Sequence, residues 1–254
     1  MAEPFKVVVP ARYGSSRLPG KPLADLHGKP MIVRVAERCA ASGAEEVVIA
    51  TDDVRIVEAV TSAGFEATMT RADHASGSDR VMEVARLRAW DDDAIVINVQ
   101  GDEPQMPPAV VMQVAQILQA DPARPVATLC EPIREVAVLT DPNVVKVVRD
   151  RWGRALYFSR APIPYERDEA PGKSGQDRGR PIGLRHIGVY GYRLSALQQF
   201  VELPVSDLER LEKLEQLRLL ENGIPIFVTE ACETVPAGVD TPADLERVRT
   251  RSPS

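Results

Sequence analysis

The stretch Lys6-Val-Val-Val-Pro-Ala-Arg-Tyr-Gly-Ser-Ser-Arg-Leu-Pro-Gly-Lys-Pro22 joins a β-branched run to a basic segment with two glycines. The run Lys6–Val9 predicts a strand, which Pro10 is expected to end. No acidic residue stands between Glu3 and Asp25. Three cations, two glycines that permit close backbone approach and two serine hydroxyls follow this strand. Together they predict a cradle for a polyphosphate. The cations are Arg12, Arg17 and Lys21.

Two better-known phosphate loops do not match this segment. A Walker A loop has four residues between its glycines, followed by Lys and then Ser or Thr. Here five residues separate Gly14 from Gly20, and Pro22 stands where the Mg²⁺-binding hydroxyl would be. The dinucleotide pattern G-x-G-x-x-G is absent from the sequence. P-loop kinases and dinucleotide-dependent dehydrogenases are therefore disfavoured.

Apolar strand-like runs alternate with helical patterns through most of the chain. Strands are expected at Val47–Ala50, Ala94–Val99, Val144–Val148, Ala155–Phe158 and His186–Tyr192. Helices are expected at Met31–Ser42, Val54–Ala63, Val110–Gln119 and Asp207–Glu221, and after an N-cap at Thr241. The Gly- and Pro-rich range 166–181 is expected to be a mobile loop. The alternation predicts an α/β fold with a mixed, mostly parallel sheet and helices on both faces. Ligands of such folds collect at the carboxyl ends of the strands.

Composition sets the remaining bounds. The 254 residues are 44% hydrophobic and carry a net charge of −6. They can form one domain, 1–254, with its own core, and they do not favour a nucleic-acid polymer as partner. No apolar run approaches the roughly 18 residues of a membrane-spanning helix, and the N-terminal run is too short for a signal peptide. Cys39, Cys130 and Cys232 are too scattered for a disulfide framework. We expect buried thiols in a cytoplasmic protein without a membrane partner.

Two distant carboxylates suggest a metal site. Asp102 lies in Asn98-Val-Gln-Gly-Asp-Glu-Pro104, after a predicted strand. Asp240 lies in Pro236-Ala-Gly-Val-Asp-Thr-Pro242, which also reads as a strand-like run followed by a glycine. Carboxylate oxygens can hold Mg²⁺ against phosphates. Because parallel strands end at the same edge, Asp102 and Asp240 are predicted to share one Mg²⁺.

Five motifs in order resemble those of a known family. The pattern Pro-Ala-Arg-x-x-Ser-x-Arg-Leu-Pro-x-Lys at 10–21 is similar to the signature of sugar nucleotidyltransferases. The others are Asn98–Pro104, Arg185-His-Ile-Gly-Val-Tyr-Gly-Tyr192, Leu214-Glu-Gln-Leu-Arg218 and Gly238-Val-Asp-Thr-Pro-x-Asp-Leu-Glu-Arg247. As a set they resemble the cytidylyltransferases of 3-deoxy-manno-octulosonate (Kdo). The resemblance runs from about Lys6 to Arg249 and departs mainly in the loop at 166–180.

The resemblance implies a nucleotide-diphospho-sugar transferase fold, CTP and Kdo as substrates, Mg²⁺, and a homodimer. The region around 130–220 would bind the sugar and form the dimer. Residues implied to bind the nucleotide are Pro10, Ala11, Arg12, Ser15, Arg17, Lys21, Ser76, Gly77, Arg80 and Gln100. Residues implied to line the sugar site are Arg160, His186, Tyr190, Glu215 and Gln216. The catalytic set would be Arg17 and Lys21, which stabilise the departing pyrophosphate, with Asp102 and Asp240 on Mg²⁺.

Some residues and some functions stay open at this point. His27 and His74 are expected to be structural, and Glu209 and Glu212 to lie on a solvated helix face. The acceptor could be another acid sugar, such as a sialic acid. A non-catalytic nucleotide-binding regulator would need the phosphate cradle but not both carboxylates. Widely separated Asp102 and Asp240 would favour that regulator.

Overall fold

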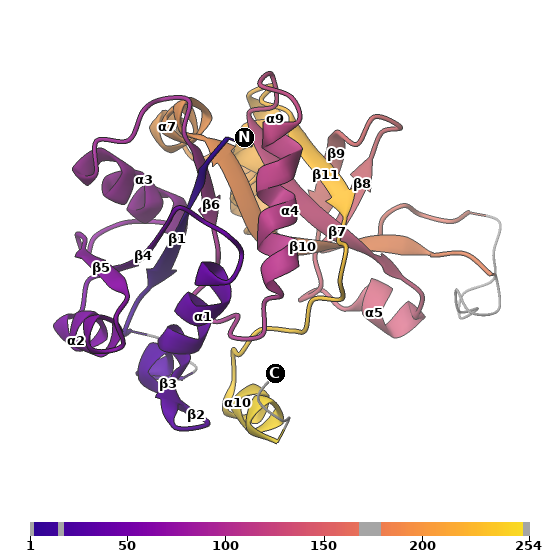
Figure 1. Cartoon of the computed structure of the whole chain (residues 1–254). Coiled ribbons are helices and arrows are strands. Elements are labelled where there is room, and N and C mark those ends of the chain that lie inside the picture. Colours follow the sequence, from indigo (N-terminus) through magenta and orange to yellow (C-terminus); the bar gives the residue numbers. More distant parts are fainter. Residues whose placement is uncertain (1–2, 15–17, 168–178, 251–254) are drawn as a thin grey trace.

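A nine-stranded mixed sheet forms the centre of the molecule (Figure 1). The computed structural model describes residues 3–14, 18–167 and 179–250. Ser15, Arg17 and most of the 166–181 loop lie outside these ranges. The strands are β1 (Phe5–Ala11), β4 (Glu46–Thr51), β5 (Glu66–Met69), β6 (Ile95–Asn98), β7 (Val126–Ile133), β8 (Lys146–Arg149), β9 (Ala155–Ser159), β10 (Gly183–Arg193) and β11 (Ile226–Glu230). Their main order is β11-β7-β10-β6-β1-β4-β5.

One strand of that order runs against the others. β1 pairs in parallel with β4 and β6, and β7 pairs in parallel with β11. β10 is antiparallel to both β6 and β7, so these two strands point the same way. The carboxyl ends of β1, β4, β5, β6, β7 and β11 therefore share one edge. The predicted mixed, mostly parallel sheet is confirmed.

Helices cover both faces of the sheet, as predicted. On one face, α1 (Met31–Ala40), α2 (Val54–Ser62) and α4 (Pro108–Gln119) share a core with Val7 and Val9. On the other, α3 (Gly77–Leu87), α7 (Leu194–Glu202) and α9 (Leu217–Glu221) share a core with Val8. Side chains of a strand alternate between faces, so the β-branched run of β1 fills both cores. A short helix α5 (Val136–Thr140), a 3₁₀ turn η1 (Lys21–Leu23) and a hairpin of β2 (Asp25–Leu26) and β3 (Lys29–Pro30) lie outside these layers.

The prediction that Pro10 ends the first strand is wrong. β1 continues to Ala11 and stays paired with β4 through Ala11 and Thr51. The amide of Val99 donates to the carbonyl of Val8, so the backbone polar groups of Val8 point toward β6. Those of Pro10, two residues later, point to the same side of the strand. Pairing with β6 ends at Val8. The missing N–H of Pro10 therefore costs no ladder hydrogen bond.

The predicted single helix Asp207–Glu221 is also wrong. It is broken into α8 (Asp207–Glu212) and α9, with Lys213 between them in the left-handed region at φ 55°. The leucine periodicity does not follow one helix: Leu214 and Leu217 are buried, while Leu211 is 80% exposed. Glu209 and Glu212 are not on a solvated face either. Glu209 pairs with Arg218, and Glu212 with the end of β9.

An extended strap, residues 231–241, joins β11 to the last helix, α10 (Pro242–Arg249) (Figure 1). Asp240 lies near its end and does not follow a strand, contrary to the prediction. The side chain of Glu131 accepts the amide of Val235 at 2.6 Å, and Arg185 donates to the Val235 carbonyl at 2.8 Å. The predicted Thr241 cap is present: Thr241 and Asp244 form a capping box.

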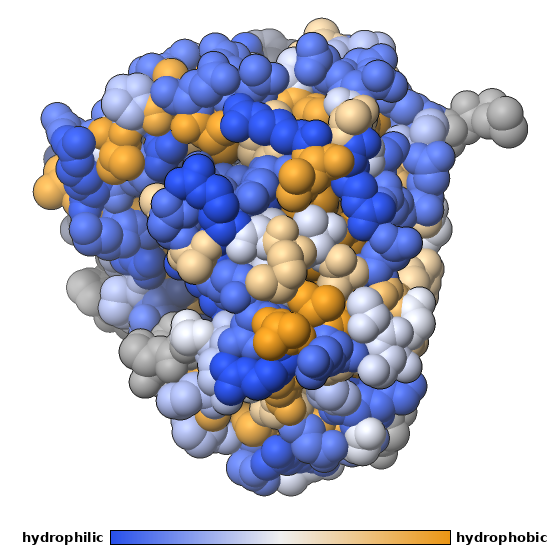
Figure 2. All heavy atoms as spheres, turned by 90° about the vertical axis from the view of Figure 1, so that its left-hand side faces the viewer, coloured by the Kyte–Doolittle hydropathy of each residue, from blue (hydrophilic) through white to orange (hydrophobic). Residues whose placement is uncertain are grey.

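The surface around α2, α3 and β5 is mainly hydrophilic, with apolar residues in small patches (Figure 2). Val54, Met69 and Leu87 on these elements are exposed. Within the described ranges, no helix combines the length and the apolar character needed to cross a membrane. Cys39 and Cys130 are buried free thiols as expected, but Cys232 is exposed.

Candidate active site

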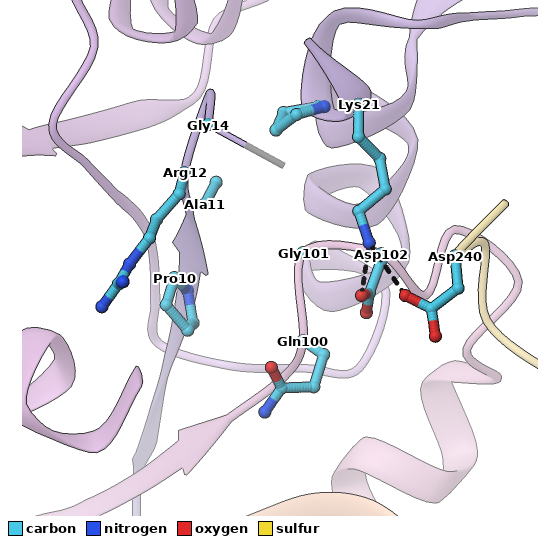
Figure 3. Close-up of a pocket in the computed structure, with 10 residues that line it drawn as sticks. Pro10, Ala11, Arg12, Gly14, Lys21, Gln100, Gly101, Asp102 and Asp240 are labelled. Atoms are coloured by element: carbon cyan, nitrogen blue, oxygen red, sulfur yellow. Dashed lines mark hydrogen bonds and ion pairs between the residues drawn. The ribbon is translucent and has the colours of Figure 1, made fainter. Parts of the chain in front are cut away.

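Two carboxylates share one ammonium group at the carboxyl edge of the sheet. Lys21 Nζ lies 2.7 Å from Asp102 Oδ2 and 3.3 Å from Asp240 Oδ1 (Figure 3). Two carboxylates with no cation between them repel each other. They stay together because the charge of Lys21 offsets that repulsion. The structure therefore brings together Lys21 and Asp240, which are 219 positions apart in the chain.

Close backbone contacts hold the two acidic residues in place. The amide of Val239 donates to the carbonyl of Asp102 at 2.8 Å, which fixes the strap beside the end of β6. A Cβ on Gly238 would lie 3.2 Å from that same carbonyl. A Cβ on Gly101 would lie 2.8 Å from the carbonyl oxygen of Pro10, a distance that a side chain cannot adopt. Glycine at 101 therefore lets the ends of β1 and β6 approach each other.

The donor set fits a nucleotide-bound Mg²⁺. Both side chains already bind one cation through carboxylate oxygens, the ligand type that Mg²⁺ prefers. In the part of the chain that the structure describes, no cluster of three or more His, Cys, Asp or Glu side chains could hold a metal. Mg²⁺ is usually bound by one or two carboxylates together with substrate phosphates. Two carboxylates at the edge of an open cavity meet that requirement, whereas an all-protein cage is absent from the described residues.

A cavity of about 370 Å³ opens beside this pair. Ten residues line it: Pro10, Ala11, Arg12, Gly14, Lys21, Pro22, Gln100, Gly101, Asp102 and Asp240. It thus contains five of the predicted nucleotide-binding residues, while Ser15 and Arg17 lie outside the described residues. The amide of Gly20 donates to the Tyr13 carbonyl at 3.2 Å and so closes the basic loop at its base. Gly20 has φ +69°, which favours glycine.

Arg12, although it lines the cavity, and the other three described nucleotide candidates make contacts elsewhere. Arg12 points away from Lys21 and donates to the carbonyl of His74 at 2.5 Å (Figure 3). Ser76 caps α3 in a capping box, and Gly77 faces the ring of Pro10. Arg80 is fully buried and donates to Thr70 at 2.5 Å and Asp52 at 3.0 Å. Ser76, Gly77 and Arg80 do not line this cavity, so a direct nucleotide contact from them remains a prediction.

A second cavity of about 480 Å³ contains the predicted sugar-binding residues. All five line it: Arg160, His186, Tyr190, Glu215 and Gln216. Glu215 and Gln216 reach it because the chain breaks between α8 and α9. Gln100 lines both cavities, so the second cavity adjoins the first. Sugar binding by the five residues of the second cavity stays a prediction, but the fold does bring the five side chains to one cavity.

Sequence reasoning missed part of the second cavity. Asn98, at the end of β6, lines it and is 4% exposed, and its Oδ1 has no hydrogen-bond partner. The hydroxyl of Tyr190 and Oε1 of Glu215 are buried without partners too. Such orphaned polar atoms are costly unless a ligand completes them. The signal for Asn98 was a polar side chain that ends the apolar run Ile95–Ile97.

Burial sets the protonation of this second cavity. Burial and the nearby Arg185 lower the pKa of His186 to about 3, so its imidazole is neutral at pH 7. Nε2 of His186 lies 3.1 Å from the hydroxyl of Thr128. Burial also raises the pKa of Glu215, an effect that the nearby hydroxyls of Ser78 and Ser76 oppose. The cavity therefore combines the neutral imidazole of His186 with the cationic side chains of Arg160 and Lys213, a set that suits a hydroxylated anion.

Glu103 is a further, largely enclosed carboxyl beside Asp102 and Asp240. Burial, and then the charges of Asp102 and Asp240, raise the pKa of Glu103 to about 8, while Arg185 opposes the shift. Its Oε2 has no hydrogen-bond partner. The side chain does not line either cavity described above. A carboxyl that is largely protonated at pH 7 adds little negative charge to the site.

The fold and site together define a nucleotidyltransferase: a cavity with two cations and two carboxylates lies at the carboxyl edge of an α/β sheet, next to a second polar cavity. A sequence model of the cytidylyltransferase family matches residues 6–229. A 3-deoxy-manno-octulosonate cytidylyltransferase of Alcanivorax borkumensis is 54% identical over 97% of this chain and 98% of its own length. The protein of the same name from Pseudomonas syringae is 54% identical over 98% of both chains.

Solved structures agree with these sequence matches. A CMP:2-keto-3-deoxy-manno-octonic acid synthetase complexed with CTP is 49% identical, has a TM-score of 0.87 and covers 97% of each chain. A cytidylyltransferase of Leptospira borgpetersenii, 16% identical with a TM-score of 0.62 over 97% of this chain and 85% of its own, shares the fold. The chain belongs to the 3-deoxy-manno-octulosonate cytidylyltransferase family.

Proposed function

We propose that this chain transfers CMP from CTP to Kdo and releases pyrophosphate, giving CMP-Kdo for lipopolysaccharide biosynthesis. The observation that carries the proposal is the shared wall at Gln100. It sets a cavity with Lys21 and two carboxylates against a cavity that combines Arg160 with neutral polar groups such as His186. A nucleoside triphosphate and a hydroxylated acid could thus meet at one boundary. The relatives with 54% identity are named for this reaction.

In the proposed reaction the anomeric hydroxyl of Kdo attacks the α-phosphorus of CTP. A new P–O bond forms, the bond to the bridging oxygen of pyrophosphate breaks, and the hydroxyl loses its proton. Such transfers depend mainly on positioning and charge stabilisation rather than on covalent catalysis. Lys21 and Arg17 would stabilise the departing pyrophosphate. Gln100, at the boundary, would orient the two substrates.

Asp102 and Asp240 would hold Mg²⁺ in this proposal, since both are within hydrogen-bonding reach of one cation in the free protein. When bound there, Mg²⁺ would offset charge at the α-phosphate. A homodimer that involves the region 130–220, and a cytoplasmic location, are part of the same proposal. Light scattering of the purified chain tests the homodimer: a monomer at micromolar concentration would contradict it.

The two rival functions are less well supported. A non-catalytic regulator was to be favoured by widely separated carboxylates, and Asp102 and Asp240 instead share Lys21. A sialic acid as acceptor remains an outcome of the test below. No described feature of the second cavity favours it over Kdo.

Pyrophosphate release with a panel of acid sugars tests the proposal. With CTP and Mg²⁺, we expect turnover with Kdo and at least about 100-fold lower kcat/KM with a sialic acid. A site that hydrogen-bonds particular substrate groups rejects analogues that lack them. Omitting Mg²⁺, with chelator present, should stop turnover. Faster pyrophosphate release with the sialic acid than with Kdo would show that the sialic acid is the acceptor. No pyrophosphate release with any sugar would favour the non-catalytic regulator.

Base choice is a separate expectation. CTP should be preferred over UTP, because acceptors that pair the cytosine amino group are left unpaired by uracil. Gln100 and backbone groups at the cavity edge are the candidates for this pairing. The measurement is kcat/KM for each nucleotide at saturating Kdo. Equal values for CTP and UTP would contradict selection at this position.

A further inference from the structure

Lys146 on β8 is fully buried, and its ammonium binds backbone oxygens. Nζ donates to the carbonyls of Asp141 at 2.9 Å, Val144 at 2.6 Å and Arg160 at 2.6 Å. A neutral amine has only two N–H groups, so three acceptors require the charged form. Burial lowers the pKa of Lys146, because an enclosed charge loses its hydration. The three carbonyls offset that loss and are drawn together around one point.

These carbonyls belong to two segments that form part of the wall of the second cavity. Asp141 and Val144 lie in the turn before β8, and Arg160 directly follows β9. Val145 and Arg160 both line the cavity that contains His186. The amide of His186 also donates to the Val145 carbonyl at 2.8 Å. The position of the ammonium therefore fixes the backbone on both sides of Val145 and at Arg160.

Arg160 extends this network to a third segment. Its amide donates to Glu212 Oε2 at 2.9 Å, and its guanidinium donates to the carbonyls of Glu212 at 2.7 Å and Pro142 at 2.9 Å. The guanidinium also reaches the carbonyl of Lys213 at 3.4 Å. It thus binds the end of α8, where the chain turns to place 213–216 in the cavity wall. The turn at 141–144, the end of β9 and the α8–α9 break are joined in this way.

We propose that Lys146 is a positioning residue for the acceptor sugar: its ammonium fixes Arg160 and the 141–145 turn, and so sets the shape of the cavity that receives Kdo. The inference rests on the function proposed above. It predicts a defect in sugar binding that leaves CTP binding intact. A role only in stability would not separate the two substrates.

Lys146→Met tests this, because it keeps the buried stem and removes only the ammonium. We expect KM for Kdo to rise at least about tenfold, with the CTP dissociation constant from calorimetry within about twofold of wild type. Arg193→Met is the matched control. Arg193 is also a buried cation that donates to backbone carbonyls, those of Asp93 at 3.0 Å and Leu118 at 3.1 Å. This control should lower Tm without changing KM for Kdo.

A second variant guards against failure of Lys146→Met to fold. Glu212→Ala releases the Arg160 amide from the other end of the network and should also raise KM for Kdo, by about fivefold or more. The inference about Lys146 would be overturned by an unchanged KM for Kdo in Glu212→Ala, or by equal losses of CTP and Kdo affinity in a folded Lys146→Met. Neither outcome would affect the proposed function. Absence of Kdo turnover in the wild-type chain would overturn the proposed function and this inference with it.

Discussion

Asp102→Asn and Asp240→Asn are each expected to reduce CMP transfer by at least about 100- to 1,000-fold. Either change leaves one full carboxylate where Mg²⁺ and the triphosphate need two. Each variant should keep its fold, because both side chains are partly exposed, at 31% and 49%. The measurements are kcat for pyrophosphate release, and Mn²⁺ affinity in the presence of CTP by electron paramagnetic resonance. We expect weaker metal binding in both variants.

Asp121→Asn is the matched control for these two substitutions. Asp121 follows α4 at the opposite edge of the sheet, before β7 begins, and pairs with the partly buried Arg124. Its amide counterpart can still accept the hydrogen bond from Ala123. Activity should stay within about twofold of wild type. If Asp240→Asn behaved like this control while Asp102→Asn did not, the shared metal site would be refuted.

Lys21→Met is expected to have two opposite effects on the same site. Turnover should fall about ten- to more than a hundredfold, since a charge-assisted contact with phosphate contributes roughly 1.5–3 kcal/mol. In the absence of nucleotide, however, Mn²⁺ should bind more tightly than to wild type. The ammonium that lies 2.7 and 3.3 Å from the two carboxylates would no longer compete with the metal. Circular dichroism should show an unchanged fold.

Lys29→Met is the matched control for Lys21→Met, because it also removes one positive charge, at a lysine outside both cavities. Lys29 lies on β3, is about half exposed and pairs with Glu37 on α1. Neither turnover nor Mn²⁺ affinity should change by more than about twofold. Weaker Mn²⁺ binding to Lys21→Met than to wild type would mean that Lys21 supports the metal site rather than competing for it.

Local patterns in the sequence determined the regular elements of the fold. The β-branched run in β1 and the i, i+3, i+4, i+7 apolar face of α1 were visible because burial on one or two faces imposes a period. The cap at Thr241 was visible because its partner, Asp244, is three residues away. The resemblance of the motifs to a known family predicted which residues form the nucleotide and sugar sites. The structure places most of the described residues of each set in one of the two cavities.

Tertiary structure decided what local patterns could not. The leucine spacing at 208–220 predicted one helix, but Arg160 binds the carbonyls of Glu212 and Lys213 and accommodates the break. Asp240 reaches Asp102 through a strap held by Glu131 and Arg185, not through a strand end. Lys21 was predicted to bind phosphate, yet its ammonium lies within ion-pair distance of both carboxylates. The cage of carbonyls around Lys146 left no mark in the sequence, because backbone oxygens are the same at every residue. Each of these features depends on groups that only folding brings within hydrogen-bonding distance.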